Sequence, residues 1–287
     1  NKGLNMYKNI LIVVLSTFLL TGCFKSNILL LLLMFSFSEA KMNMFQSVSP
    51  SEATIVQTGE DKMYCPNCGM FLPKFWKTSH AVKFRNGTYR QFCSMYCLVE
   101  QLELTELRGK RDTVQEFLVT DVKSLKYIDA YKAFYVVASS KKGTMTVTSK
   151  YAFKDKKDAE KFKAKNGGDI MNFNSAYNIA LTDFARDTGL VFAKRSSKMY
   201  KKGKMIYNNK CNKNRLEKLD AHTMGNMKAL IKNSKVCGDL NNSQLQAVML
   251  YFWDVRLNKF DELYGQNKDV EKHAKKFQQK FENMDNK

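Results

Sequence analysis

Four cysteines stand in two closely spaced pairs, a pattern typical of residues that share one metal ion. They are Cys65 and Cys68, followed by Cys93 and Cys97. Pro66 and Gly69 favour a tight turn around the first pair, and two thiolates on one turn can clamp a metal ion. The second pair lies where we expect a strand to run into a helix, whose N-terminus stabilises thiolates. The spacing therefore predicts one site built from four thiols.

Three interpretations of these thiols differ in what the sulfur atoms bind. Four thiolates suffice for a structural zinc ion, and two pairs separated by a hairpin resemble treble-clef and zinc-ribbon sites. A pair of disulfides is permitted in an oxidising compartment. Copper(I) prefers soft ligands, both thiolate and thioether. Met63, Met70 and Met95 lie beside the cysteines, which favours copper(I) as the functional interpretation, although methionines more often fill protein cores.

The rest of the composition narrows the class of protein. The chain has 287 residues, of which 44% are hydrophobic and 26% charged, so it is globular and long enough for one large or two small domains. Only three histidines are present, which leaves little room for a His-rich metal site. Lys and Arg outnumber Asp and Glu by 47 to 27, which suggests an anionic partner or surface. The sequence has no Ser-His-Asp series, Gly-rich phosphate loop or paired carboxylates, so we expect no enzyme.

A hairpin and a helix must position the cysteine pairs. Residues 81–89 alternate between apolar and polar side chains and break at Asn86-Gly87, a strong hairpin-turn dipeptide. Residues 95–107 place leucines near helical spacing. This spacing predicts a helix that contains the last cysteine of the cluster.

A second set of elements follows along the chain. Residues 133–138 predict a buried strand, and the alternating run T-M-T-V-T-S at residues 144–149 predicts another. Residues 155–165 predict a charged helix that ends at a Gly-Gly C-cap. A short strand is expected at residues 170–173.

The predicted fold class is α+β. Residues 80–107 and residues 131–165 each run strand, strand, helix, so we expect a treble-clef-like domain of two such halves, followed by a small, mostly α domain. The chain is expected to contain a targeting region, a linker, the α+β domain, a helical domain and a charged helical tail. Their bounds are residues 1–40, 41–60, 61–185, 186–257 and 258–287.

The ordered motifs of the α+β region resemble those of the NosL family. The first, Cys65-Pro-Asn-Cys68-Gly69-Met70, is similar to the family's C-x-x-C-G-M signature. Three further stretches match in order: Phe92-Cys93-Ser94 with Cys97-Leu98, Phe134-Tyr135-Val136-Val137 followed by Gly143-Thr144-Met145, and Ala159 to Phe162 with Gly167-Gly168. The resemblance covers about residues 60–185. NosL proteins are exported lipoproteins that act as copper chaperones for nitrous-oxide reductase.

This resemblance implies a copper(I) carrier. The ligand positions that match are Cys65, Cys68, Met70 and Met145. Cys93 and Cys97 are then extra copper ligands, half of a zinc site, or a disulfide. Many family members also carry a histidine soon after the C-G-M element. Residues 71–79 contain none, so His80 is the nearest candidate, and without it copper would be held by sulfur alone.

The N-terminal region has the order of an export signal. Lys8 precedes an apolar run over residues 10–20, and Leu20-Thr-Gly-Cys23 resembles a bacterial lipobox, in which Cys23 is lipidated. A second apolar run at residues 28–37 is too short to span a bilayer alone. We therefore expect an exported protein on the periplasmic side of a bacterial membrane, with a lipid anchor.

The predicted helical domain resembles a small class I cytochrome c only in outline. Asn-Lys-Asn-Arg follows Cys211, so the C-x-x-C-H motif is missing and we expect no haem. Cys211 and Cys237 are expected to form a disulfide. Residues 194–215 contain nine lysines or arginines and no acid. Such a run is typical of a solvated face, or of contact with anionic lipid or an acidic partner. The export signal argues against nucleic acid.

These observations fit best an exported, membrane-tethered copper(I) metallochaperone. It would assist copper-site assembly in nitrous-oxide reductase or supply another copper-accepting protein. Two alternatives remain. A structural zinc-bearing interaction module would use the four thiols without moving metal. A periplasmic thiol redox protein would use Cys65 and Cys68, although no thioredoxin-like βαβ pattern surrounds them.

Overall fold

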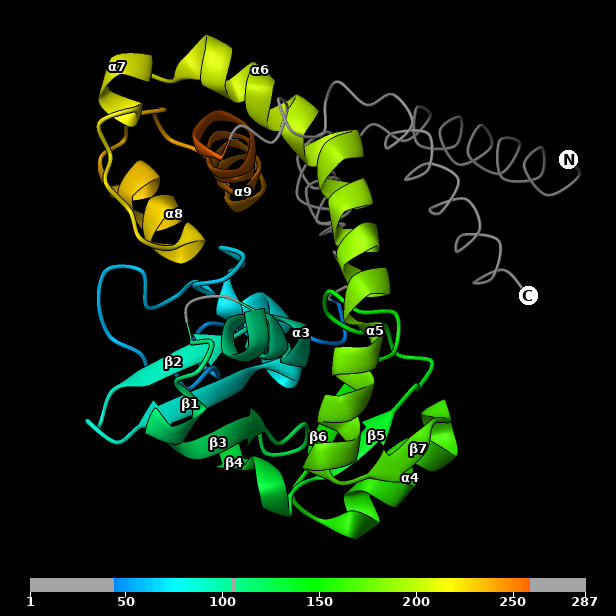
Figure 1. The fold of residues 1–287 in the computed structure, drawn as a ribbon. Coiled ribbons are helices and arrows are strands. Elements are labelled where there is room, and N and C mark those ends of the chain that lie inside the picture. Colours follow the sequence, from blue (N-terminus) through cyan, green and yellow to red (C-terminus); the bar gives the residue numbers. More distant parts are fainter. Residues whose placement is uncertain (1–43, 105–106, 259–287) are drawn as a thin grey trace, which may run out of the picture. The chain divides into compact units, whose positions relative to one another are not determined.

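The computed structural model describes residues 44–104 and 107–258, which belong to one unit, Met44–Lys287 (Figure 1). The predicted targeting region with Cys23, the first residues of the linker and the tail from residue 259 onward lie outside the described residues. Within the described part, no helix is long and apolar enough to cross a membrane. Strands and helices are mixed along the chain, which agrees with the predicted α+β class.

A four-stranded antiparallel sheet, in the order β2-β1-β3-β4, lies beside the cysteine pairs. Its strands are β1 (His80–Phe84), β2 (Tyr89–Phe92), β3 (Val114–Thr120) and β4 (Tyr127–Asp129). The predicted hairpin is confirmed. It joins β1 to β2, and Gly87 in its turn has a φ of 83°, which glycine adopts without steric cost. Because β2 ends at Phe92, Cys93 leaves the sheet toward the next helix.

The helix predicted after this hairpin is also present. α3 (Met95–Val99) begins at the N-cap Ser94, whose hydroxyl accepts a hydrogen bond from the Cys97 amide. A π-helical turn, Glu100–Leu104, continues α3. All five residues of α3 are buried, so the helix is held by packing rather than by its short length.

A second antiparallel sheet has the order β6-β5-β7. Its strands are β5 (Phe134–Val137), β6 (Lys150–Phe153) and β7 (Asp169–Met171), and α4 (Lys156–Asn166) connects β6 to β7. The buried strand, the charged helix and the short strand predicted here are confirmed. α4 ends at Gly167, where φ is 71° and the amide donates to the Lys163 carbonyl. β7 is short because Asn172 caps the next helix.

The strand predicted at residues 144–149 is wrong, because this segment is a loop that ends where β6 begins. Its alternating side chains have another cause. The hydroxyl of Thr144 is 2.7 Å from that of Thr78, so this polar position is fixed by a side-chain contact. Met145 has a φ of 57°, which lies outside the range of β-strands. The alternation of side chains in this segment therefore does not arise from a β-strand.

Helices predominate in the described chain after β7. They are α5 (Phe173–Lys194), α6 (Tyr200–Lys210), α7 (Lys213–Leu216), α8 (Met224–Asn233) and α9 (Asn242–Leu250), with π-helical turns at Arg195–Met199 and Tyr251–Leu257. α5 runs through residue 185, where the sequence suggests a domain boundary. Gly203 of α6 allows a close approach to α9, since a Cβ there would lie 2.2 Å from the Ala247 carbonyl oxygen.

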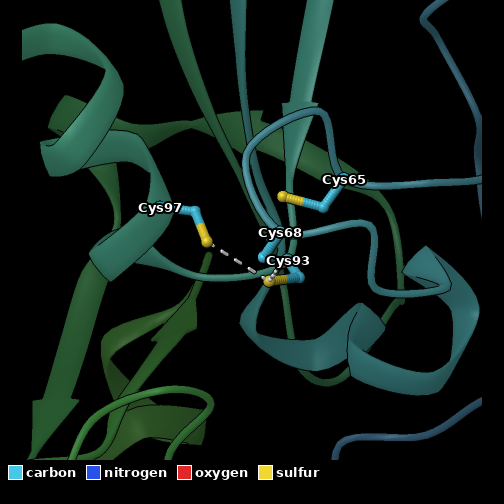
Figure 2. A group of neighbouring side chains, drawn as sticks. All are labelled: Cys65, Cys68, Cys93 and Cys97. Carbon is cyan, nitrogen blue, oxygen red and sulfur yellow. Dashed lines mark hydrogen bonds between the residues drawn. The ribbon is translucent and has the colours of Figure 1, made fainter. Parts of the chain in front are cut away.

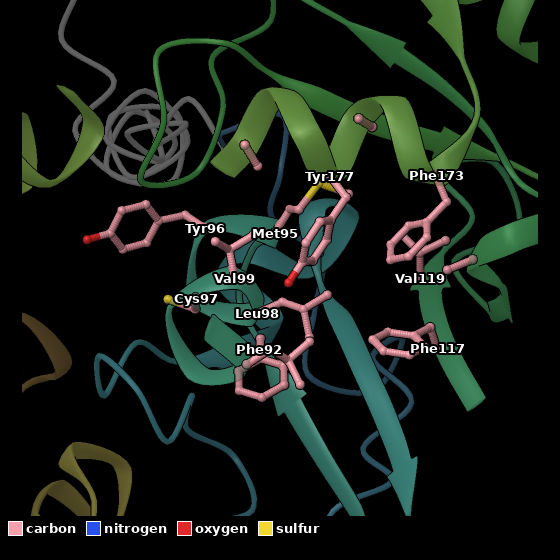
Figure 3. Close-up of a cluster of buried hydrophobic side chains, with 14 of the residues drawn as sticks. Phe92, Met95, Tyr96, Cys97, Leu98, Val99, Phe117, Val119, Phe173 and Tyr177 are labelled. Atoms are coloured by element: carbon pink, nitrogen blue, oxygen red, sulfur yellow. The ribbon is translucent and has the colours of Figure 1, made fainter. Parts of the chain in front are cut away.

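The core around the second cysteine pair is formed by α3, the first sheet and α5 (Figure 3). Aromatic side chains contribute much of it. Phe117 and Tyr177 pack against Phe173, with ring centroids 5.6 and 5.7 Å away. Tyr96 of α3 stacks on Phe184 of α5 at 4.9 Å. A separate buried cluster joins α6, α8 and α9.

Candidate metal centre

The first cysteine pair lies on a tight turn, residues 65–70, which we call the thiol turn. Its backbone closes on itself: Cys65 N donates to Met70 O, and Gly69 N donates to Cys65 O, both at 2.8 Å. Gly69 has a φ of 67°, a conformation that residues with a Cβ adopt rarely. The turn predicted from the sequence is therefore present.

The second cysteine pair spans the junction between β2 and α3. Cys93 follows the last residue of β2, and its carbonyl accepts a hydrogen bond from Thr78 Oγ1 at 2.9 Å. Cys97 lies in the first turn of α3, with its amide on the Ser94 hydroxyl. The sequence predicts that this helix start stabilises thiolates, but burial outweighs any such effect, because it raises the pKa of both Cys93 and Cys97 well above the usual range.

The two pairs converge on one point in the interior (Figure 2). All four sulfur atoms lie within 4.8 Å of one another, and each cysteine is fully buried. The Sγ atoms of Cys68 and Cys93 are 3.5 Å apart, and those of Cys93 and Cys97 are 3.6 Å apart. Sulfur atoms around a tetrahedral zinc ion are about 3.8 Å apart, whereas a disulfide requires about 2.05 Å. The four thiols are free and spaced as metal ligands, so the two-disulfide interpretation does not describe this structure.

A thioether extends this sulfur cluster. Met145 Sδ lies 3.5 Å from Cys97 Sγ. Met145 is half-buried and packs against the core that contains the four cysteines, and so does Met70. The carbonyl of Met70 also closes the thiol turn. The structure therefore brings both predicted methionines to the core around the thiols, with a direct sulfur contact from Met145.

His80, the remaining predicted ligand, is not part of the group of clustered ligand atoms. Its Nδ1 lies 3.0 Å from the Thr78 carbonyl oxygen, and its Nε2 lies 3.4 Å from the Tyr135 hydroxyl. Burial lowers the pKa of His80 to about 4, so the ring is neutral at neutral pH. Because β1 places both ring nitrogens against other partners, the candidate site consists of sulfur alone.

Negative charge in the metal-free cluster is concentrated on one thiol. Burial raises the pKa of Cys65, but hydrogen bonds from the other three thiols outweigh it and hold this pKa well below its usual range. Burial raises the pKa of Cys93 and of Cys97 well above the usual range, and hydrogen bonding with Cys65 adds to the effect. A metal ion that binds all four sulfur atoms must therefore displace protons.

The other predicted features lie on the helices. Cys211, at the end of α6, and Cys237, after α8, are joined by a disulfide. Most basic residues of the stretch at residues 194–215 are exposed. Arg195 differs, because its guanidinium pairs with Asp254 at 3.2 Å in a largely buried position.

Sequence reasoning missed two side chains that touch the thiol turn. Gln246 Nε2 of α9 donates to the Cys68 carbonyl oxygen at 2.9 Å, and Lys228 Nζ of α8 donates to the Gly69 carbonyl oxygen at 2.8 Å. Burial lowers the pKa of Lys228 to about 7. The signal in the sequence is weak, since Lys228 merely stands between two apolar residues of an amphipathic helix.

Comparison with known proteins finds a similarity over part of the chain. No curated protein matches the chain. Among solved structures, the copper chaperone NosL from Shewanella denitrificans is similar at 25% sequence identity and a TM-score of 0.33, over 42% of this chain and 91% of that one. The NosL family model matches residues 56–178, which include all four clustered cysteines. The family is one of copper chaperones and not of enzymes. Residues 56–178 are therefore the part of the chain that is similar to NosL proteins.

Proposed function

We propose that this protein is an exported, membrane-tethered metallochaperone that binds copper(I) and assists copper-site assembly in nitrous-oxide reductase. One observation carries the proposal: the Met145 thioether lies 3.5 Å from Cys97 Sγ, beside a cluster of four buried thiols. Copper(I) is the ion that selects thiolate and thioether sulfur together. The similarity of residues 56–178 to NosL proteins supports the role of a carrier.

Thiolates and thioethers contribute differently to such a site. Cys65 and Cys68 supply charged sulfur and hence affinity, whereas Met70 and Met145 bind without losing a proton. Cys93 and Cys97 complete the sulfur cluster as further ligands. Copper leaves by ligand exchange, in which each bond to a sulfur of this protein is replaced by a bond to the acceptor. The metal stays copper(I) throughout, so no oxidant or reductant is needed.

The N-terminal sequence supports export and tethering. The lipobox-like Leu20-Thr-Gly-Cys23 favours lipid attachment at Cys23 on the periplasmic side of a bacterial membrane. Exposed lysines on α6 add an attraction to anionic lipid. The acceptor is then a copper protein of the same compartment, and the similarity to NosL proteins favours nitrous-oxide reductase.

A structural zinc site is the second candidate function. The thiol turn followed by a cysteine pair at a helix N-terminus is a treble-clef-like arrangement. Sulfur separations of 3.5 and 3.6 Å also suit four thiolates around zinc. In this role the domain would hold a partner protein and would move no metal.

Metal binding by the full chain, purified without oxygen, separates these functions. We expect copper(I) to be retained in the presence of excess zinc and to be weakened by Cys68→Ser and by Met145→Leu. Met205→Leu is the matched control, because Met205 is 65% exposed on α6. Zinc that copper(I) cannot displace would contradict the proposal and favour the structural site. A reversible dithiol that binds neither metal would favour the thiol redox alternative.

A further inference from the structure

Helices from the far end of the described chain cover the thiol turn. Lys228 of α8 reaches Gly69 O across a sequence separation of 159 residues, and Gln246 of α9 reaches Cys68 O across 178 residues. The amide of Gly225, in the first turn of α8, adds a hydrogen bond to the Pro66 carbonyl oxygen at 3.3 Å. Three carbonyls of the thiol turn, those of Pro66, Cys68 and Gly69, are therefore held by residues outside the matched range 56–178.

Lys228 is the centre of this contact. Its side chain is 1% exposed, which is rare for a lysine. Its Nζ donates to Gln246 Oε1 at 2.6 Å as well as to Gly69 O, and lies 4.6 Å from the ring centroid of Tyr64. A buried polar group destabilises a protein unless it has such partners. The three contacts therefore join α8, α9 and the thiol turn at one buried atom.

The helices lie close to the thiol turn at two glycines. A Cβ on Gly69 would lie 2.3 Å from Met249 Cε, and a Cβ on Gly225 would lie 3.0 Å from Cys65 O. The first clash involves the flexible end of a methionine, which could move, whereas the second involves backbone and is tighter than most real Cβ contacts. Glycine at both positions thus lets the backbone of the turn meet α8 and α9 directly.

We propose that α8 and α9 form the outer wall of the cysteine site, in which Lys228 and Gln246 are positioning residues that hold the thiol turn and slow the loss of bound metal. The inference rests on the proposed function for its copper(I) cargo. The physical reason is that the directions of the Cys65 and Cys68 thiolates depend on the backbone that carries them. Loss of an outer hydrogen-bond partner typically weakens metal binding by roughly 10- to 100-fold.

The test compares two lysines on the same helix. Lys228→Met removes the buried donor, and Lys232→Met changes an exposed lysine one turn further along α8. The full chain is loaded with copper(I) without oxygen, and the rate of copper transfer to bathocuproine disulfonate is measured. We expect transfer from Lys228→Met to be roughly 10- to 100-fold faster and transfer from Lys232→Met to match the unaltered protein. Lys228→Gln, which keeps an N–H donor, should restore most of the difference. Equal rates in all four proteins would overturn the proposal.

A second measurement keeps the inference separate from the proposed function. The thiols of the metal-free chain are titrated with Ellman's reagent, which needs no copper. If α8 and α9 hold the thiol turn, the thiols of Lys228→Met should react faster with Ellman's reagent than those of Lys232→Met. If the unaltered protein binds no copper(I), the proposed function fails while the thiol rates still decide whether the wall exists. If circular dichroism shows that Lys228→Met is unfolded, Gln246→Met replaces it, and unchanged thiol rates in that variant overturn the wall.

Discussion

The two groups of cysteines in the described chain show how backbone geometry decides between a metal site and a disulfide. The four clustered thiols come from a closed turn and a capped helix start, and neighbouring sulfur atoms lie 3.5 and 3.6 Å apart. Cys211 and Cys237 come from two helix ends and are covalently joined. Cys237 is nearly as deeply buried as the four thiols, whereas Cys211 is half-buried, so burial of a cysteine does not by itself keep its sulfur free. Fixed backbone on both sides keeps the four sulfurs at ligand spacing.

Removal of one clustered thiol should produce the largest difference between the two groups of cysteines. Cys68→Ser should lower copper(I) affinity by more than roughly 100-fold, which is the largest loss expected when only a hydrogen-bond partner of a ligand is removed. The reason is that a hydroxyl is a poor ligand for a soft ion. Competition with a copper(I) chelator, without oxygen, measures the affinity. The matched control is the double variant Cys211→Ser and Cys237→Ser, whose copper(I) affinity should be unchanged. Equal losses in both would mean that the two groups do not differ in function.

Removal of the disulfide should instead lower the stability of the fold. Its cysteines are 26 residues apart, and a cross-link of this length restricts the unfolded chain enough to contribute about 3 kcal/mol. The double variant Cys211→Ser and Cys237→Ser should lower the free energy of unfolding by this amount in urea denaturation. Reduced unaltered protein serves as a control and should show a similar loss. A double variant as stable as the oxidised unaltered protein would show that the disulfide does not stabilise the fold.

Much of the fold around the thiols follows from local sequence patterns. The hairpin at β1 and β2 and the C-cap of α4 depend on glycines at left-handed positions, which the sequence displays. The four-thiol cluster was also predictable, because each pair lies on a local element, a turn or a helix start. The loop at residues 144–149 was not predictable, because its alternation of threonines imitates a strand. Only the tertiary contact of Thr144 with Thr78 explains it.

Contacts between residues that are far apart in the sequence leave no recognisable pattern in it. Lys228 and Gln246 meet the thiol turn across more than 150 residues, and no spacing rule connects them. His80 shows the reverse error. It is close to the cysteines in sequence, yet its place on β1 directs it to Tyr135. A place for Met145 beside the cysteines was expected only from the resemblance to the NosL family, since its residues also suit a strand, and its contact with Cys97 was not predicted.

A smaller difference between the two groups is their response to pH. Burial raises the pKa of Cys93 and of Cys97 above the usual range, so both are protonated at neutral pH. Copper(I) must displace these protons, so its affinity should fall as pH falls, roughly tenfold per pH unit for each proton released. The disulfide holds no proton and adds no such slope. Chelator competition over a pH series measures the slope, and Cys93→Ser should make it shallower. Affinity that does not change with pH would contradict thiolate binding.

The smallest expected effect tests whether the thioether belongs to the site. Met145→Leu keeps the volume and apolar character of the side chain, so the fold should be retained. It removes a neutral sulfur while leaving four thiols, and copper(I) affinity should fall by about tenfold, the lower end of losses for an outer partner. Met205→Leu is the control on an exposed methionine. Met145 and Met70 are half-buried, whereas the four thiols are fully buried, so an acceptor would reach bound copper through a thioether. Met145→Leu should therefore slow copper transfer to an acceptor protein even though it weakens binding. If it transfers copper faster in proportion to its lost affinity, Met145 only retains the metal and takes no part in the exchange.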